Sequence, residues 1–276
     1  MTLPTRFVKM AGGGNDFLVF EADGRRVTEE ERERIALLCR RGLSVGADGV
    51  LLLSGGGEGR VRVDYFNADG GLAAFCANGT RCAARYAVGR RLVSGDRPVL
   101  ETGWGPVTAR VEGETVTLWL QPLPAPGDPI LVWGEGLPTT GTPMHVGVPH
   151  LVIFVEGDLD ALPLKSLAPP LRSHPAMPEG ANVNFVEVVG PDRIRVRTYE
   201  RGVEGETLAC GSGVVASAIV AARQRRVRPA VACGTKSGVD FSVTFREADG
   251  FIVDATLTGD AREIFTATLT EEAWKK

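Results

Sequence analysis

Short apolar runs recur along the whole chain, and their length and composition predict a protein made mostly of β-strands. Runs of a few residues rich in valine, leucine and phenylalanine are typical of strands. In the first half they read RFVKMA, FLVFEA, GVLLLS, RVRVDYF, PVLET, PVTARV and TVTLWLQ. In the second half they read LVIFVEG, NVNFVEVV, RIRVRTY, AVACGT, VDFSVTF and FIVDATL. We therefore expect each half of the chain to form a sheet.

Three segments carry helical signals instead. Thr28 and Glu31 form a capping box, and the helix that it opens should end near Gly42. A second helix follows Cys76. The third, at 211–224, is apolar almost all round until its last residues, so it should be buried inside its sheet rather than lie on the surface.

The two halves also repeat one another. Cys76 and Cys210 lie 134 residues apart, and at the same interval KMAGGGNDFLVFE is followed by PMHVGVPHLVIFVE. Several matches at one offset indicate an internal duplication. We predict an α+β fold with two pseudo-symmetric domains, each a mixed, mostly antiparallel sheet wrapped around a central helix. The proline-rich segment at 121–129 predicts the boundary between them.

The composition of the chain limits the kinds of binding partner and the cellular compartment that can be expected. The chain has 276 residues, 43% of them hydrophobic and 24% charged, and its net charge of −3 argues against a nucleic acid or an anionic membrane as partner. No apolar run approaches the roughly 18 residues of a membrane span, and MTLPTRFVKMAGG lacks the apolar core of a signal peptide. Five cysteines, an odd number, indicate free thiols in a reducing compartment. We therefore expect a cytoplasmic protein.

The sequence predicts chemistry without a metal or an organic cofactor. No CxxC occurs, and none of the three histidines pairs with a cysteine at zinc-finger spacing, so no metal site is expected. A phosphate-binding lysine loop and a GxGxxG between a strand and a helix are also missing from the sequence. Side chains and backbone groups are thus expected to do the chemistry themselves.

The candidate chemistry lies at Cys76 and Cys210. Each stands directly before small residues that open a helix, in CANG and CGSG. Helix N-termini favour negative charge, so each thiol should have a pKa below its free value of about 8.5, and the neighbouring N–H groups can hold a carboxylate. With the two junctions on opposite sides of one small molecule, one sulfur could remove a proton from carbon while the other returns a proton to the opposite face. Cys39 and Cys82 are expected to be core residues and Cys233 a strand residue.

Motifs along nearly the whole chain resemble the diaminopimelate epimerase family. They read KMAGGGNDF, VGADG, YFNADG with CANGTRC, GVPH, ANVNF and YERGVEGETLACGSG. The resemblance implies a pyridoxal-independent isomerase that interconverts LL- and meso-diaminopimelate in lysine and peptidoglycan-precursor synthesis, usually as a homodimer. It also implies that the last strand returns to the first domain, which gives domains of 1–120 with 263–276 and of 121–262.

The resemblance also implies a role for each matching residue. Cys76 and Cys210 would be the acid–base pair, with Cys76 deprotonating the LL isomer and Cys210 the meso isomer. His150 and Glu200 would flank the thiols and tune their protonation. The residues implied to bind substrate are Asn15, Asn67, Ala77, Asn78, Asn182, Glu200, Arg201, Gly211 and Ser212.

The resemblance implies that different residues among these bind different parts of the substrate. The backbone at 77–78 and at 211–212 would hold the reacting carboxylate. Asn67, Asn182 and Arg201 would bind the distal amino-acid end, where Arg201 offers a planar fork for a carboxylate. Glu200 can accept an ammonium group.

Three positions depart from the family pattern. Ala11 replaces a histidine in the glycine-rich turn, and Ala77 replaces a glycine after the first cysteine. Val148 replaces an asparagine that contacts the distal end of the substrate in the family. Losing an amide there removes a hydrogen bond of about 0.5–1.5 kcal/mol. Diaminopimelate remains the favoured substrate, and a racemase or epimerase of the same fold acting on another amino acid is the first alternative.

The second alternative is not an enzyme. Two low-pKa thiols at Cys76 and Cys210 could form a reversible disulfide, which would make the protein a redox switch. Turnover of diaminopimelate would separate this hypothesis from the epimerase hypothesis.

Overall fold

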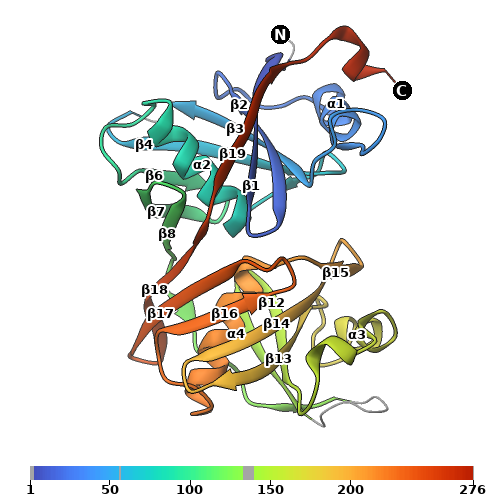
Figure 1. The fold of residues 1–276 in the computed structure, drawn as a ribbon, viewed down its shortest axis with the longest axis vertical. Coiled ribbons are helices and arrows are strands. Elements are labelled where there is room, and N and C mark those ends of the chain that lie inside the picture. Colours follow the sequence, from blue (N-terminus) through green and yellow to red (C-terminus); the bar gives the residue numbers. More distant parts are fainter. Residues whose placement is uncertain (1–2, 56, 133–139, 276) are drawn as a thin grey trace. The chain divides into compact units, whose positions relative to one another are not determined.

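The computed structural model describes residues 3–55, 57–132 and 140–275 (Figure 1). They divide into two compact units, which are described separately. The first comprises Met1–Trp119 and Gly259–Lys276, and the second comprises Leu120–Thr258. Within the three described ranges, no helix is long and apolar enough to cross a membrane.

The first unit is built on one mixed sheet. Its strands are β1 (Arg6–Gly12), β2 (Asn15–Glu21), β3 (Gly49–Gly55), β4 (Arg60–Asn67), β5 (Leu72–Ala73), β6 (Val99–Thr102), β7 (Gly105–Glu112), β8 (Thr115–Trp119) and β19 (Arg262–Thr268). Neighbours follow the order β1, β2, β3, β4, β6, β7, β8, and the pairs are antiparallel except for β2–β3 and β4–β6. The last strand, β19, pairs antiparallel with β1, so the chain ends in the unit in which it begins.

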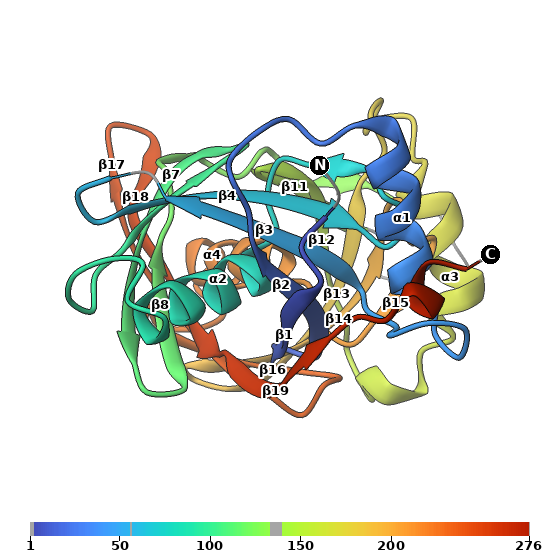
Figure 2. The same ribbon diagram turned by 90° about the horizontal axis from the view of Figure 1, so that it is seen from above.

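Two helices cover opposite faces of this sheet, as Figure 2 shows. The helical segments of the unit are α1 (Glu29–Cys39), α2 (Ala77–Gly89) and the short η2 (Glu271–Trp274). Side chains alternate between the two faces of a strand. Leu18 therefore packs with Ile35 of α1, while its neighbour Phe17 lies beside Gly79 in the first turn of α2.

The second unit repeats this plan. Its strands are β9 (Leu123–Pro124), β10 (Ile130–Leu131), β11 (Thr140–Val146), β12 (Val148–Phe154), β13 (Asn182–Gly190), β14 (Arg193–Glu200), β15 (Gly205–Thr207), β16 (Val231–Thr235), β17 (Asp240–Ala248) and β18 (Phe251–Asp260). Its helical segments are η1 (Leu159–Ala161), α3 (Leu164–Arg172) and α4 (Gly211–Arg223). Neighbours follow the order β11, β12, β13, β14, β16, β17, β18, and only β12–β13 and β14–β16 are parallel. The same pairings thus recur in the same order, which confirms the predicted duplication.

A central helix lies against each sheet, as predicted. In α4 the side chains of Val214, Val215 and Ile219 are fully buried. This helix contacts β11, β12, β13, β14, β16 and β17 of its own unit. The corresponding helix α2 contacts β1, β2, β3, β4, β6, β7, β8 and β19. The apolar composition of 211–224 is therefore explained by burial on nearly every side.

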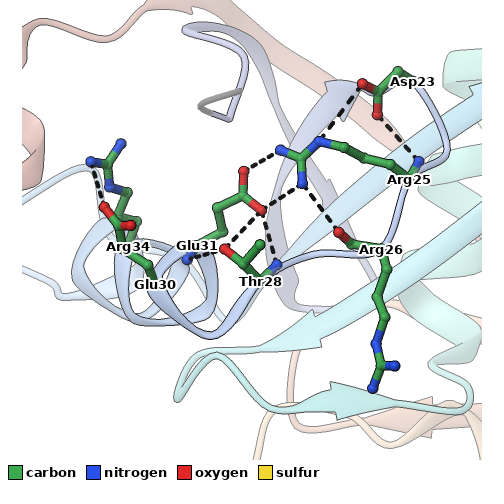
Figure 3. A network of polar contacts seen from close by, with 7 residues as sticks. All are labelled: Asp23, Arg25, Arg26, Thr28, Glu30, Glu31 and Arg34. Atoms are coloured by element: carbon green, nitrogen blue, oxygen red, sulfur yellow. Dashed lines mark hydrogen bonds and ion pairs between the residues drawn. The ribbon is translucent and has the colours of Figure 1, made fainter.

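The predicted capping box is present at the start of α1 (Figure 3). The Thr28 hydroxyl accepts the Glu31 N–H, and the Glu31 carboxylate accepts the Thr28 N–H. The Arg25 guanidinium also donates to Glu31, and this bond, with the bonds from Thr28, lowers the pKa of that carboxyl to about 2. The predicted end near Gly42 is wrong, because Arg40 already has an extended backbone and α1 ends at Cys39.

One α-helix of the described residues, α3, was not predicted. The segment of α3 contains Pro169 and Pro170, which lack the N–H that an interior helical position needs. It nevertheless buries Leu164, Ala168 and Leu171 on one face. Packing of that face overrides the local signal.

The three remaining cysteines are buried, as predicted. Cys39 lies in α1, Cys82 in α2 and Cys233 in β16. Burial raises the pKa of Cys39 and that of Cys82 to about 12, and it raises the pKa of Cys233 further. All three thiols are therefore neutral and unreactive at neutral pH.

Candidate active site

Cys76 is the N-cap residue of α2. Its backbone is extended, with φ −141° and ψ 110°, which is usual for the residue that opens a helix. The Gly79 N–H donates to the sulfur over 3.5 Å. The side chain is partly exposed, whereas Ala77 and Asn78 behind it are buried. The thiol thus lies at the positive end of the helix dipole with access to solvent.

Cys210 holds the same position on α4. Its backbone is again extended, with φ −114° and ψ 108°, and the helix begins at Gly211. The sulfur lies 3.5 Å from the Ser212 hydroxyl oxygen, and the residue is 8% exposed. The second thiol therefore has similar backbone geometry but less contact with solvent.

Asn15 and Asn67 lie at one end of the first unit's sheet. Phe17 pairs with Gly49, and Gly49 pairs with Asn67, so the start of β2, the start of β3 and the end of β4 form one row. Asn15 begins β2, and Asn67 is exposed at the end of β4. The register places both asparagines at the same edge.

A chain of amide hydrogen bonds connects Asn15 to the first turn of α2. The Asn78 amide donates to Asn15 Oδ1 over 2.7 Å, and the Asn15 amide donates to Asp48 Oδ2 over 2.9 Å. The Asp16 N–H donates to the same carboxylate oxygen over 3.1 Å. This chain fixes the direction in which the Asn15 amide points.

His150 is the most enclosed titratable group of the second unit's site. It is fully buried on β12, and Asn184 Nδ2 lies 3.2 Å from its Nδ1. Burial, followed by the electrostatic effects of His145 and Arg201, lowers the pKa of His150 to about 3, so the ring is neutral at pH 7. Its Nε2 is buried and has no hydrogen-bond partner among the residues that the structure describes.

Asn184 links His150 to the first turn of α4. Its amide oxygen accepts the Thr198 hydroxyl over 3.0 Å. A Cβ on Gly213 would lie only 2.2 Å from that oxygen, so glycine is required for the helix to approach this closely. The turn after Cys210 is thus packed against a neutral polar cluster of Asn184, His150 and Thr198.

Of the predicted distal residues, Asn182 and Arg201 meet at the start of β13 and the end of β14, whereas Asn67 lies on β4 of the first unit. The Arg201 N–H donates to Asn182 Oδ1 over 2.8 Å, and the Arg201 guanidinium donates to the carbonyl of Glu179 over 2.7 Å. The Thr207 hydroxyl donates to Glu200 Oε1 over 2.6 Å. Asn182, Glu200 and Arg201 are therefore held in one place by their own hydrogen bonds.

The three residues that depart from the family pattern lie on β12, on β1 and at the start of α2. Val148 begins β12 and pairs with Val146 across the tight turn at Gly147, whose φ is +72°. Ala11 lies in β1 opposite Asp16. Ala77 is the first residue of α2. Val148 presents an apolar, half-buried side chain at the position of the family's amide.

Sequence reasoning missed four residues of these clusters: Asp48, Arg81, Asn184 and Thr198. Three of them carried a usable signal. Asp48 stands in the VGADG motif, and Arg81, which donates to Asn78 Oδ1 over 2.7 Å, stands in CANGTRC. Asn184 is two residues beyond Asn182, on the same face of its strand. Thr198 gave no such signal, because polar side chains are normally expected to be exposed.

Comparison with known proteins identifies relatives of the whole chain. A family model described as Diaminopimelate epimerase matches residues 7–119 and 143–261. The diaminopimelate epimerase of Aquifex aeolicus is 37% identical, over 96% of this chain and 98% of the relative. That of Archaeoglobus fulgidus is 39% identical, over 95% of each chain.

Solved structures with lower identity share the fold. A probable proline racemase from Agrobacterium radiobacter has a TM-score of 0.71 at 17% identity, over 96% of this chain and 93% of that chain. A Bacillus anthracis protein of the PhzF family has a TM-score of 0.71 at 16% identity, over 96% of this chain and 99% of that one. The sequence matches and the fold agree, and the chain belongs to the diaminopimelate epimerase family.

Proposed function

We propose that the protein is an isomerase that interconverts LL- and meso-2,6-diaminopimelate at one α-carbon, without a cofactor, in lysine and peptidoglycan-precursor synthesis. One observation carries the proposal: each of two units with the same strand pairings places a cysteine at the N-cap of its central helix. A single base can serve only one face of a carbon. Inversion needs a second group on the other face, and the duplicated junction provides one.

The reaction is a two-base proton transfer. With the LL isomer, the Cys76 thiolate takes the α-proton and becomes a thiol, and the Cys210 thiol gives its proton to the opposite face of the same carbon and becomes a thiolate. With the meso isomer the roles are exchanged. The negative charge that moves onto the substrate carboxylate in the transition state is stabilised by backbone N–H groups at Ala77, Asn78, Gly211 and Ser212.

The remaining polar groups bind and orient the substrate. Asn67, Asn182 and Arg201 bind the distal amino-acid end, and Glu200 accepts an ammonium group. Asn15 contacts the substrate through an amide whose direction is fixed by Asn78 and Asp48. His150 acts as a neutral ring, because burial keeps its pKa near 3.

The proposal also includes the domain bounds, the oligomeric state and the cellular compartment. The proposed domains comprise 1–120 with 263–276 and 121–262. The protein works as a homodimer in the cytoplasm, and exposed Ile264 and Phe265 on β19 support a partner surface on the first unit.

Deuterium uptake from solvent tests the function. Incubation of LL-diaminopimelate with the protein in D₂O should form the meso isomer, with deuterium at one of its two α-carbons. Cys76→Ala and Cys210→Ala should each lower kcat by about a thousandfold. Cys233→Ala is the matched control, since that thiol is buried and neutral. Epimerisation retained in either single variant would contradict the two-base scheme.

Val148 favours a second candidate, a racemase or epimerase of the same fold that acts on another amino acid. Its side chain cannot replace the hydrogen bond of an asparagine amide. This candidate predicts deuterium exchange into an amino acid with one carboxylate and none into diaminopimelate. Val148→Asn would then be expected to raise the exchange into diaminopimelate.

The redox switch remains the candidate from a different class. It predicts no deuterium uptake into either substrate, together with a disulfide between Cys76 and Cys210 that forms under mild oxidation and is lost with dithiothreitol. Peptide mapping of the oxidised protein would detect it.

A further inference from the structure

Four charged side chains of the first unit form one cluster near the turn between β1 and β2. Its members are Lys9 of β1, Asp16 of β2, and Arg41 and Asp48 of the loop between α1 and β3. The Lys9 ammonium lies 2.6 Å from Asp16 Oδ2 and also donates to the carbonyl of Gly46. Lys9 is only 9% exposed, and a buried charge costs several kcal/mol unless it is well paired. The ammonium is thus held firmly against the Asp16 carboxylate.

Arg41 bridges the two carboxylates of the cluster. Its Nη1 donates to Asp16 Oδ2 over 3.2 Å, and its Nη2 donates to Asp16 Oδ1 and, over 2.7 Å, to Asp48 Oδ1. Burial would raise the pKa of Asp16, but the hydrogen bonds from Arg41 and Lys9 outweigh it, so the pKa of Asp16 is lowered. The guanidinium therefore ties the loop after α1 to the start of β2.

The cluster reaches Asn15 through Asp48. While Asp48 Oδ1 binds Arg41, Asp48 Oδ2 accepts the Asn15 amide over 2.9 Å and the Asp16 N–H over 3.1 Å. An ionised carboxylate can only accept hydrogen bonds, so the nitrogen of the Asn15 amide has to face it. The Asn15 oxygen accepts the Asn78 amide over 2.7 Å on its other side. Rotation of the Asn15 amide by half a turn would place its oxygen against the carboxylate.

The second unit lacks these charges at the corresponding positions of its sequence. The interval of 134 residues places His150 opposite Asp16 and Asn182 opposite Asp48, and β12 pairs with β13 as β2 pairs with β3. The two positions that correspond to the cations are both proline. The same strand pairings therefore form with uncharged residues in all but the histidine position. The cluster is not a requirement of the shared fold, which favours a role in the first unit's site.

We infer that Arg41 is a positioning residue that fixes the Asp48 carboxylate and, through it, the substrate-binding amide of Asn15. The inference rests on the proposed function and adds the group that holds one of its substrate contacts. An amide that is already fixed loses little rotational freedom when the substrate binds. Loss of Arg41 should therefore weaken substrate binding and leave the proton transfers at the two cysteines largely unchanged.

Steady-state epimerisation of LL-diaminopimelate by three variants tests the inference. Arg41→Met should raise KM about fivefold, a typical loss for one hydrogen bond, and should change kcat by less than about twofold. Arg41→Lys should recover only part of the loss, because an ammonium lacks the planar fork that bridges two carboxylates. Arg60→Met is the matched control, since Arg60 is an exposed arginine of the same unit that pairs with Glu101. An unchanged KM in folded Arg41→Met would overturn the inference.

A double-mutant cycle separates positioning from a general structural role. Asn15→Ala should raise KM by itself, and Arg41→Met added to it should raise KM no further, because the amide on which Arg41 acts is then missing. A structural role for Arg41 would multiply the two effects. Multiplied effects would therefore contradict the inference.

Hydrogen exchange of side-chain amides, measured by NMR on ¹⁵N-labelled protein without substrate, needs no turnover. In the wild-type protein the Asn15 amide protons should exchange more slowly than those of Asn67, which is exposed at the end of β4. Arg41→Met should bring the Asn15 rate towards that of Asn67. Equal rates in the wild type would overturn the inference, even if Arg41→Met fails to fold. A wild-type protein that does not epimerise diaminopimelate would refute the proposed function, and the exchange rates would still test the link from Arg41 to Asn15.

Discussion

The two cysteine junctions have the same backbone and different surroundings. Both thiols cap a central helix from an extended residue, in sheets with the same order of strand pairings. Around α2 the neighbours are charged, with Arg81 buried and Asp48 bonded to Asn15. Around α4 the neighbours are Asn184 and a neutral His150. Duplication thus preserved the position of a cysteine at the N-cap of each central helix. The side chains around the two cysteines differ between the units.

The largest effect on stability is expected at the glycine three residues after each cysteine. A Cβ at Gly213 would lie 2.2 Å from Asn184 Oδ1, and Asn184 is held by His150 and Thr198. Gly213→Ala should therefore lower the free energy of unfolding by about 3 kcal/mol and also lower turnover.

Gly79→Ala is the matched variant in the first unit. Its Cβ would lie 3.2 Å from Leu51 Cδ2, the end of a side chain that can move. We expect a change of less than about 1 kcal/mol, because alanine also favours the helix. Urea unfolding of both variants measures the difference, and equal losses would show that the two first turns are packed alike.

The neutral state of His150 predicts a pH dependence that belongs to the second unit. Its pKa is about 3 in the folded protein and about 6.5 when unfolded, so the unfolded state binds the extra proton as the pH falls. The contribution of the neutral His150 to the free energy of unfolding is present above pH 6.5. It should fall by about 2 kcal/mol between pH 6.5 and 5. His150→Gln should flatten this part of the curve, and His174→Gln should not. A curve that His150→Gln leaves unchanged would mean that the ring is charged in the folded protein.

The corresponding helices α1 and α3 offer a smaller contrast. In α1 the Glu31 carboxylate binds Arg25 and the Thr28 N–H, whereas the N-cap residue of α3 is Pro163, which makes no side-chain cap bond. Glu31→Ala should destabilise the protein by about 1.5 kcal/mol. Since the pKa of Glu31 is lowered to about 2, its contribution should be present above about pH 4.5 and be lost as the pH falls towards 2.

The exposed pair of Glu30 and Arg34 supplies the control for Glu31. Glu30→Ala should change stability by less than about 0.5 kcal/mol, because exposed ion pairs contribute little. Thermal unfolding at pH 7 and at pH 3 compares the two variants. An equal loss of stability in both variants would show that Glu31 contributes no more than an exposed ion pair.

Apart from the control variants, the smallest effect is expected from the other half of the capping box. Thr28→Ala removes the acceptor of the Glu31 N–H and should cost about 1 kcal/mol. Thr28→Ser keeps the hydroxyl and should restore most of that stability. A loss as large as that of Glu31→Ala would show that the threonine, rather than the arginine pair, holds the start of α1.

Sequence patterns predicted the strands and the two central helices, because both depend on local composition. Runs such as FLVFEA and GVLLLS became β2 and β3, and the apolar segment at 211–224 became the buried helix α4. The predictions failed where packing overrides local preference. The face of Leu164, Ala168 and Leu171 makes a helix of α3 despite its two prolines.

The site was predicted unevenly for a related reason. Motifs in the sequence placed Cys76 and Cys210 directly before a helix, and the structure confirms that position for both. Arg81 and Asn184 were missed, because burial of a polar side chain depends on neighbours far away in the sequence. Asp260, for example, is 179 residues from Arg81, whose guanidinium its carbonyl accepts.

The return of β19 to β1 has a consequence for protein synthesis. On the ribosome, residues of the second unit emerge before the strand that completes the first, and Asp260, which binds the N–H of Gly13 and the side chain of Arg81, emerges with that late segment. The edge of β1 that pairs with β19 therefore stays open until β19 has been translated. Truncation before β19 would leave β1 without this antiparallel partner.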